Sequence, residues 1–144
     1  MNRIRVAVVG ITAIGIGLAG CGQGSTEAVN DPPAALEAVE GTDLSRITLT
    51  AKAVERLGIE TASVEDGPGQ SLTVPYGAVL YDSNGDAWTY INPEGNVYVR
   101  EPIVVDEIDG DVAVLTDGPE PGTLVVTIGV AELYGTETGV GGGH

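Results

Sequence analysis

Hydrophobic and polar residues alternate in short runs from residue 44 to residue 128, and turn-forming residues separate the runs. Runs with a period of two residues predict β-strands that bury one face. We expect strands at residues 47–50, 59–64, 71–74, 79–81, 88–91, 97–100, 103–105, 112–115 and 124–128. The pattern predicts one small, mostly β domain over residues 44–138, with a barrel-like or sandwich-like arrangement of its strands.

One or two short helices are expected beside these strands. Residues 51–57 have helical spacing, Thr50 precedes them as an N-cap and Gly58 follows as a C-terminal stop. Residues 131–134 predict one further helical turn. The Asn-Gly pair within residues 82–86 predicts a hairpin between the strands on either side of it.

The N-terminus has a different pattern. Arg3 and Arg5 are followed by an apolar and small-residue run over residues 6–18. This run is shorter than the about 20 apolar residues of a membrane-spanning helix, and it predicts a secretory signal peptide over residues 1–20. Residues 18–21, Leu-Ala-Gly-Cys, resemble the lipobox of bacterial lipoproteins, which implies cleavage before Cys21 and a lipid on its sulfur. The alternative is a buried cysteine in an N-terminal helix, which the four glycines of residues 10–20 disfavour.

The segment after Cys21 is small, polar and acidic, with two prolines at its centre. Residues 21–43 therefore predict a lipidated cysteine and a flexible tether, which holds the domain at the extracytoplasmic face of the cell membrane. Residues 34–40 predict at most a brief helix, too short to be stable alone. The glycine-rich residues 139–144 predict a disordered tail.

The charge of the chain narrows the possible partners. The chain has 21 acidic and six basic residues and a net charge of −15. Cleavage would remove Arg3 and Arg5, leaving four basic residues and a net charge of 4 − 21, or −17. Such a domain repels nucleic acid and bare anionic lipid, so an electrostatically steered partner is expected to be cationic. With Cys21 acylated, no thiol remains for a disulfide or a metal.

Three segments resemble the periplasmic adaptor proteins, or membrane fusion proteins, of resistance-nodulation-division efflux systems, especially the heavy-metal branch. They occur in family order at residues 47–65 ("ITLTAKAVERLGIETASVE"), 73–105 and 117–135 ("DGPEPGTLVVTIGVAELYG"). The resemblance implies a membrane-proximal β domain that docks on an inner-membrane transporter or on a full-length adaptor.

The chain also departs from that family. Only "EDGPGQSLT" separates Val64 from Val74, which leaves no room for the lipoyl halves and the helical hairpin of a full adaptor. We therefore expect a lipid-anchored, non-catalytic accessory or docking subunit of a membrane transporter. The alternative is a lipoprotein that binds a small ligand or a divalent cation.

Weak cation-binding candidates occur in two acidic turns. Asp82, Asn84 and Asp86 alternate as calcium ligands do, but the glycine is fourth instead of sixth and no bidentate glutamate follows at the required position. Asp109 and Asp111 belong to a second acidic cluster. A hairpin turn and a solvated turn are the preferred interpretations.

Other chemistry lacks its residues. With Cys21 acylated, Met1 and His144 are the only candidate ligands for a soft metal. His144 is in the predicted disordered tail, where it cannot be held in position as a catalytic base. No cofactor and no enzymatic activity are expected. The aromatic residues are interpreted as half-buried packing in preference to a ligand groove; they are Tyr76, Tyr81, Trp88, Tyr90 and Tyr98.

Overall fold

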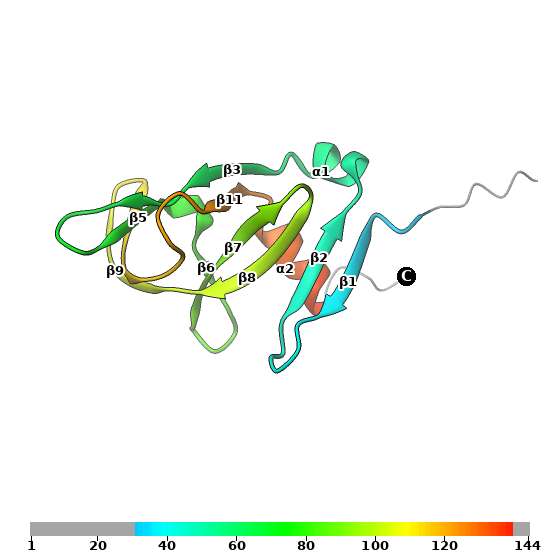
Figure 1. The fold of residues 1–144 in the computed structure, drawn as a ribbon, viewed down its shortest axis with the longest axis horizontal. Coiled ribbons are helices and arrows are strands. Elements are labelled where there is room, and N and C mark those ends of the chain that lie inside the picture. The colour runs from blue at the N-terminus through cyan, green and yellow to red at the C-terminus, as the bar shows by residue number, and fades with distance from the viewer. Residues whose placement is uncertain (1–30, 140–144) are drawn as a thin grey trace, which may run out of the picture. The chain divides into compact units, whose positions relative to one another are not determined.

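The computed structural model describes residues 31–139. The predicted signal peptide, Cys21 and all but the first residue of the predicted tail lie outside the described residues. The described residues form two antiparallel β-sheets and two short α-helices (Figure 1). The predicted fold class, mostly β with one or two short helices, is confirmed. Within residues 31–139 neither sheet closes into a barrel.

The first sheet has seven strands in the described region, in the order β1-β2-β8-β7-β11-β3, with β6 paired to β7. Its strands are β1 (Ala34–Ala38), β2 (Ser45–Leu49), β3 (Glu60–Ser63), β6 (Leu80–Tyr81), β7 (Ala87–Glu94), β8 (Val97–Pro102) and β11 (Leu124–Ile128). The expected hairpin is confirmed, because Leu80 pairs with Trp88 and Tyr81 with Ala87 around the Asn-Gly turn.

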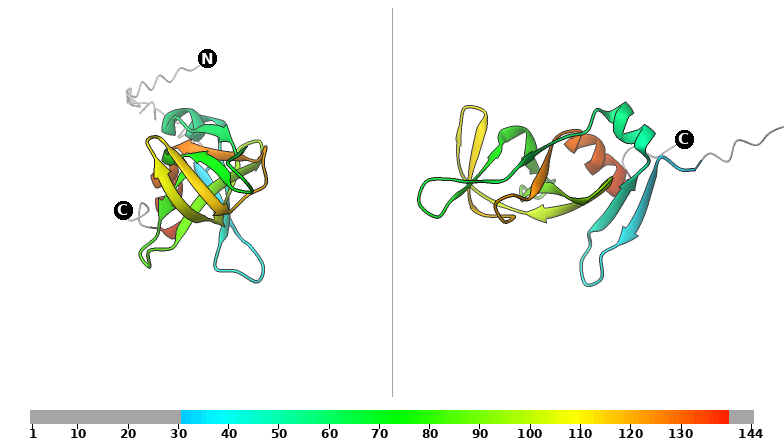
Figure 2. Two further views of the ribbon diagram at one scale, coloured as in Figure 1. Left: turned by 90° about the vertical axis from the view of Figure 1, so that its left-hand side faces the viewer. Right: turned by 45° about the horizontal axis from the view of Figure 1, so that its top comes forward.

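The second sheet has four strands in the order β4-β5-β10-β9. They are β4 (Glu65–Asp66), β5 (Leu72–Pro75), β9 (Val104–Asp109) and β10 (Val112–Asp117), and a short 3-10 helix, η1 (Tyr76–Ala78), follows β5. Within the unit that begins at Asp31, the β1–β2 hairpin and the second sheet lie at opposite ends (Figures 1 and 2).

Helix α1 (Ala51–Leu57) has the ends that the sequence predicts. The Thr50 side chain accepts a hydrogen bond from the Ala53 N–H at 3.1 Å. Gly58 adopts a left-handed conformation, with φ of 61°, that closes the helix at its C-terminus.

The core consists of two hydrophobic clusters on opposite sides of β11. Val126 belongs to the cluster that includes Tyr90 and Leu133, while the neighbouring Val125 belongs to the cluster that includes Val74 and Leu115. Consecutive strand residues point to opposite faces, so β11 joins the two clusters. The first cluster packs the helices on the first sheet, and the second packs the two sheets together.

Two expectations are corrected. Residues 34–38, expected to belong to a tether with a brief helix, form strand β1, which pairs with β2 from Ala34↔Leu49 to Ala38↔Ser45. The folded domain therefore begins near residue 34 instead of residue 44. Helix α2 (Val130–Thr138) has nine residues and exceeds the single turn expected at residues 131–134.

Candidate functional site

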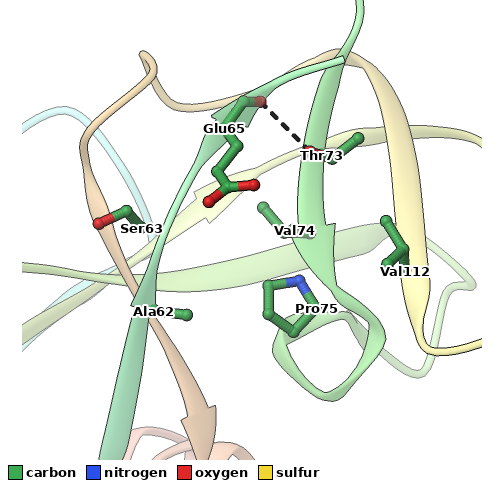
Figure 3. A pocket seen from close by; sticks show the side chains of 7 residues that line it. All are labelled: Ala62, Ser63, Glu65, Thr73, Val74, Pro75 and Val112. Carbon is green, nitrogen blue, oxygen red and sulfur yellow. Dashed lines mark hydrogen bonds between the residues drawn. The ribbon is translucent and has the colours of Figure 1, made fainter. Parts of the chain in front are cut away.

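A groove lies where β3 passes over the second sheet (Figure 3). It has a volume of about 260 Å³ and is lined by Ala62, Ser63, Glu65, Thr73, Val74, Pro75 and Val112. Thr73 Oγ1 donates to the Glu65 carbonyl at 3.5 Å, which links β4 to β5 beside the groove (Figure 3). The volume is below the about 300–1,000 Å³ of typical small-molecule pockets, so the groove suits a side chain of a partner better than an enclosed ligand.

A buried charge cluster lies where α2 packs on β2, beside the side chain of Arg100 from β8. The carboxylate of Glu137 accepts hydrogen bonds from the Tyr90 hydroxyl at 2.5 Å, the Ser45 N–H at 3.2 Å and Arg100 Nη2 at 3.5 Å. Arg100 Nε lies 3.2 Å from Glu137 Oε2, an ion pair whose angle falls outside hydrogen-bond geometry. The side chain of Glu137 is only 3% exposed.

Aromatic rings enclose the guanidinium of this cluster. Arg100 Cζ lies 4.4 Å from the centre of the Trp88 ring and 5.4 Å from that of Tyr134. Burial and the hydrogen bond to Glu137 raise the pKa of Tyr90 far above its ordinary value. With the guanidinium and the carboxylate directed at each other, this cluster joins α2 to the first sheet and offers no free acid or base.

In the Asp82–Asp86 turn, the carboxylate of Asp82 accepts hydrogen bonds from the turn itself and from Trp88. Asp82 Oδ1 accepts from the N–H groups of Asn84 at 2.8 Å and Asp86 at 3.0 Å, and Oδ2 accepts from Trp88 Nε1 at 3.1 Å. Burial raises the pKa of Asp82, but these hydrogen bonds outweigh it and the pKa is lowered overall. The carboxylate stabilises the hairpin in the manner of an Asx turn.

The second candidate pair, Asp109 and Asp111, flanks the β9–β10 turn, where Gly110 has a positive φ of 60°. Both aspartates are exposed. Among residues 31–139, no three His, Cys, Asp or Glu side chains gather as a metal site, so the two acidic turns are not brought together.

Sequence reasoning missed both the groove and the buried cluster. Arg100 and Glu137 are 37 positions apart, and the groove joins residues of β3, β4, β5 and β10, so neither has a local sequence signal. Half-buried packing is expected for the aromatic residues; Tyr90 and Tyr98 are buried in the core, while Tyr76 and Tyr81 are about half exposed.

The described residues include no helix that is long and apolar enough to cross a membrane. Comparisons with protein-family models, with characterised proteins and with solved structures found no match to this chain.

Proposed function

We propose that this protein is a lipid-anchored, extracytoplasmic and non-catalytic docking subunit of a membrane transporter. The observation that carries the proposal is the order of features along the chain. A short apolar segment ends in the lipobox-like residues 18–21, and a folded β domain begins at β1, with residues 22–33 between the two.

The adaptor-like segments support the same proposal because they meet in one sheet. Residues 47–65 contribute most of β2 and all of β3, residues 73–105 contribute β7 and β8, and residues 117–135 contribute β11. These strands are neighbours in the order β2-β8-β7-β11-β3. The three segments therefore act together as the framework of a single domain.

The start of β1 sets how far the domain can stand from a lipid on Cys21. Residues 22–33 separate the cysteine from Ala34. A chain of that length reaches at most about 45 Å even when fully extended. A domain anchored in this way stays near the bilayer, within reach of the extracytoplasmic parts of an integral membrane protein.

The chemistry of the domain favours docking over catalysis. The groove is too small to enclose a typical ligand, and the carboxylates of Asp82 and Glu137 are committed to hydrogen bonds within the fold. Exposed apolar side chains and unpaired surface carboxylates are the features that remain for recognition.

The test is transport in a strain that lacks the gene. We expect the deletion to reduce efflux of the transporter's substrates, and the tagged, full-length protein to co-purify with that transporter from detergent. A plasmid copy should restore efflux, whereas Cys21→Ala should not. Unchanged efflux in the deletion strain, together with no transporter in the purified material, would contradict the proposal.

A further inference from the structure

The outward face of the second sheet has a regular arrangement of side chains. Ala113 and Leu115 of β10 are fully buried in the core. Because successive side chains of a strand point to opposite faces, Val112 and Val114 point outward. Residues directly opposite in an antiparallel pair share a face. The register therefore gives two outward rows, Asp109–Val112–Pro75 and Glu107–Val114–Thr73–Glu65.

The longer row is apolar in the middle and acidic at both ends. Val114 and the methyl-bearing Thr73 lie between Glu107 on β9 and Glu65 on β4. Adjacent strands are about 4.8 Å apart, so the three strand spacings between the two glutamates amount to about 14 Å. That separation is too large for one cation to be held by both carboxylates.

No positive charge is available on the strands of this sheet. The sequence has no Lys or Arg at residues 57–99 or 101–144. The two ion pairs among the described residues, Arg46–Glu94 and Arg100–Glu137, belong to the first sheet and α2. Nearby, burial and, to a smaller extent, the charges of Asp117 and Glu120 raise the pKa of Glu101 on β8.

The groove continues this face toward β3. Thr73, Pro75, Val112 and Glu65 line the groove and also belong to the two rows (Figure 3). Val112 is 41% exposed. An apolar side chain of a partner can therefore enter beside Val112 and Pro75 while its neighbours reach the carboxylates at the rim.

We propose that this acidic face, formed by Glu65, Thr73, Pro75, Glu107, Asp109, Val112 and Val114, binds an extended, cationic segment of a partner protein. This inference rests on the proposed function and names the chemistry that the partner presents. An extended chain advances about 3.4 Å per residue, so side chains at positions i and i+4 are about 14 Å apart. Lysine or arginine at those positions matches Glu107 and Glu65, with an apolar residue at i+2 over Val114 and Thr73.

Charge complementarity favours a cationic protein segment over a second copy of this chain, nucleic acid or anionic lipid. A second copy of the chain would bring another acidic surface, since each copy has a formal net charge of −15 before processing. Nucleic acid and anionic lipid are repelled for the same reason. A basic protein segment is attracted, and its charges steer association.

The test titrates peptides into the isotope-labelled full chain in zwitterionic phosphocholine micelles, followed by NMR. The probe peptide is Gly-Lys-Ser-Val-Ser-Lys-Gly, blocked at both ends, which has lysines at i and i+4. The matched peptides replace both lysines with glutamate, or place the lysines next to each other. We expect the probe to shift the amides of Thr73, Val112 and Val114, and to bind more tightly than either matched peptide.

Substitutions separate this face from general attraction to an acidic protein. We expect Glu65→Gln with Glu107→Gln to weaken binding about fivefold, because two exposed ion pairs are lost. The control, Glu37→Gln with Glu132→Gln, removes two exposed carboxylates from β1 and α2 and should leave binding unchanged. Binding of the probe should also disappear in 1 M salt, because the Debye length there is only about 3 Å and the attraction between exposed charges is screened.

Equal binding to both double variants, or amide shifts elsewhere on the domain, would overturn the inference. So would a titration in which CaCl₂, but not the peptide, shifts the amides of this face. The peptide experiment requires no transporter, so its failure leaves the transport experiment on the proposed function standing. Loss of efflux without peptide binding contradicts only this inference, whereas peptide binding with unchanged efflux contradicts only the proposed function.

Discussion

At the residue scale, the buried cluster around Glu137 shows how an acidic domain uses its few basic side chains. Arg100 is taken out of solvent, stacked against Trp88 and paired with the carboxylate of α2. Arg46, in contrast, stays 43% exposed and lies 3.9 Å from Glu94 in a surface pair. Surface pairs contribute little to stability, whereas breaking a buried pair leaves an uncompensated charge in the interior.

The first prediction concerns Glu137→Gln. The variant keeps an acceptor for Tyr90 but removes the negative charge opposite Arg100, and we expect the free energy of unfolding to fall by about 3 kcal/mol. Urea denaturation of the variant and the parent measures the change. Glu132→Gln, an exposed position on the same helix, should change it by less than about 0.5 kcal/mol. A Glu137→Gln variant as stable as this control would show that the cluster is not a stabilising contact.

The second prediction concerns pH. Because the pKa of Tyr90 is raised in the folded state, the folded protein holds the hydroxyl proton more tightly than the unfolded chain does. The resulting stability is complete below the ordinary tyrosine pKa of 10.0 and is lost as pH rises above it.

Denaturation at several pH values between about 8 and 11 tests this. Tyr90→Phe is less stable at neutral pH by about 1 kcal/mol, because Glu137 loses a hydrogen bond, and it loses less further stability above pH 10. The exposed Tyr76→Phe is the control and should follow the parent. Parallel curves for the parent and Tyr90→Phe would contradict the assignment.

At the element scale, helix α1 was predictable because its signals are local. Thr50 caps its first turn and Gly58 ends it, and both lie within one residue of the helix. The strands around the Asn-Gly turn were predictable for the same reason. Local chemistry at an element's ends is sufficient when the turn residues have strong conformational preferences.

Strand β1 was missed because its residues prefer a helix when considered alone. The residues of the strand are AALEA, which are strong helix formers. Pairing with β2, from Ala34↔Leu49 onward, overrides that preference. Helix α2 was underestimated for a similar reason, since Glu137 is held at its C-terminal end by Arg100, Tyr90 and Ser45, none of which is near it in sequence.

The third prediction tests whether β1 belongs to the fold. Deleting residues 31–40 from a chain that begins at residue 31 should reduce the free energy of unfolding by about 2 kcal/mol, because five cross-strand pairs of about 0.2–1 kcal/mol each are lost. Urea denaturation measures the difference. Leu36→Ala, at a position that is 48% exposed, should have little effect. Equal stability of the two chains would restore the interpretation of this segment as a tether.

At the scale of the whole molecule, charge and attachment act together. The second sheet has no Lys or Arg on its strands, while Arg46, Lys52 and Arg56 belong to β2 and α1 in the first part of the domain. A strongly acidic domain does not bind an anionic bilayer by itself. In the proposed function, membrane placement must therefore come from the lipid on Cys21.

The fourth prediction addresses this central claim directly. Two or three acyl chains contribute about 0.8 kcal/mol per buried CH₂, which is enough for stable anchoring where one chain is not. Fractionation of cells that express the parent or Cys21→Ala, with the intact mass of each protein measured, tests the claim. We predict a parent that is membrane-bound, cleaved before residue 21 and heavier by its acyl chains, and a Cys21→Ala variant that is released or uncleaved. A Cys21→Ala variant that is membrane-bound and processed like the parent would contradict the account.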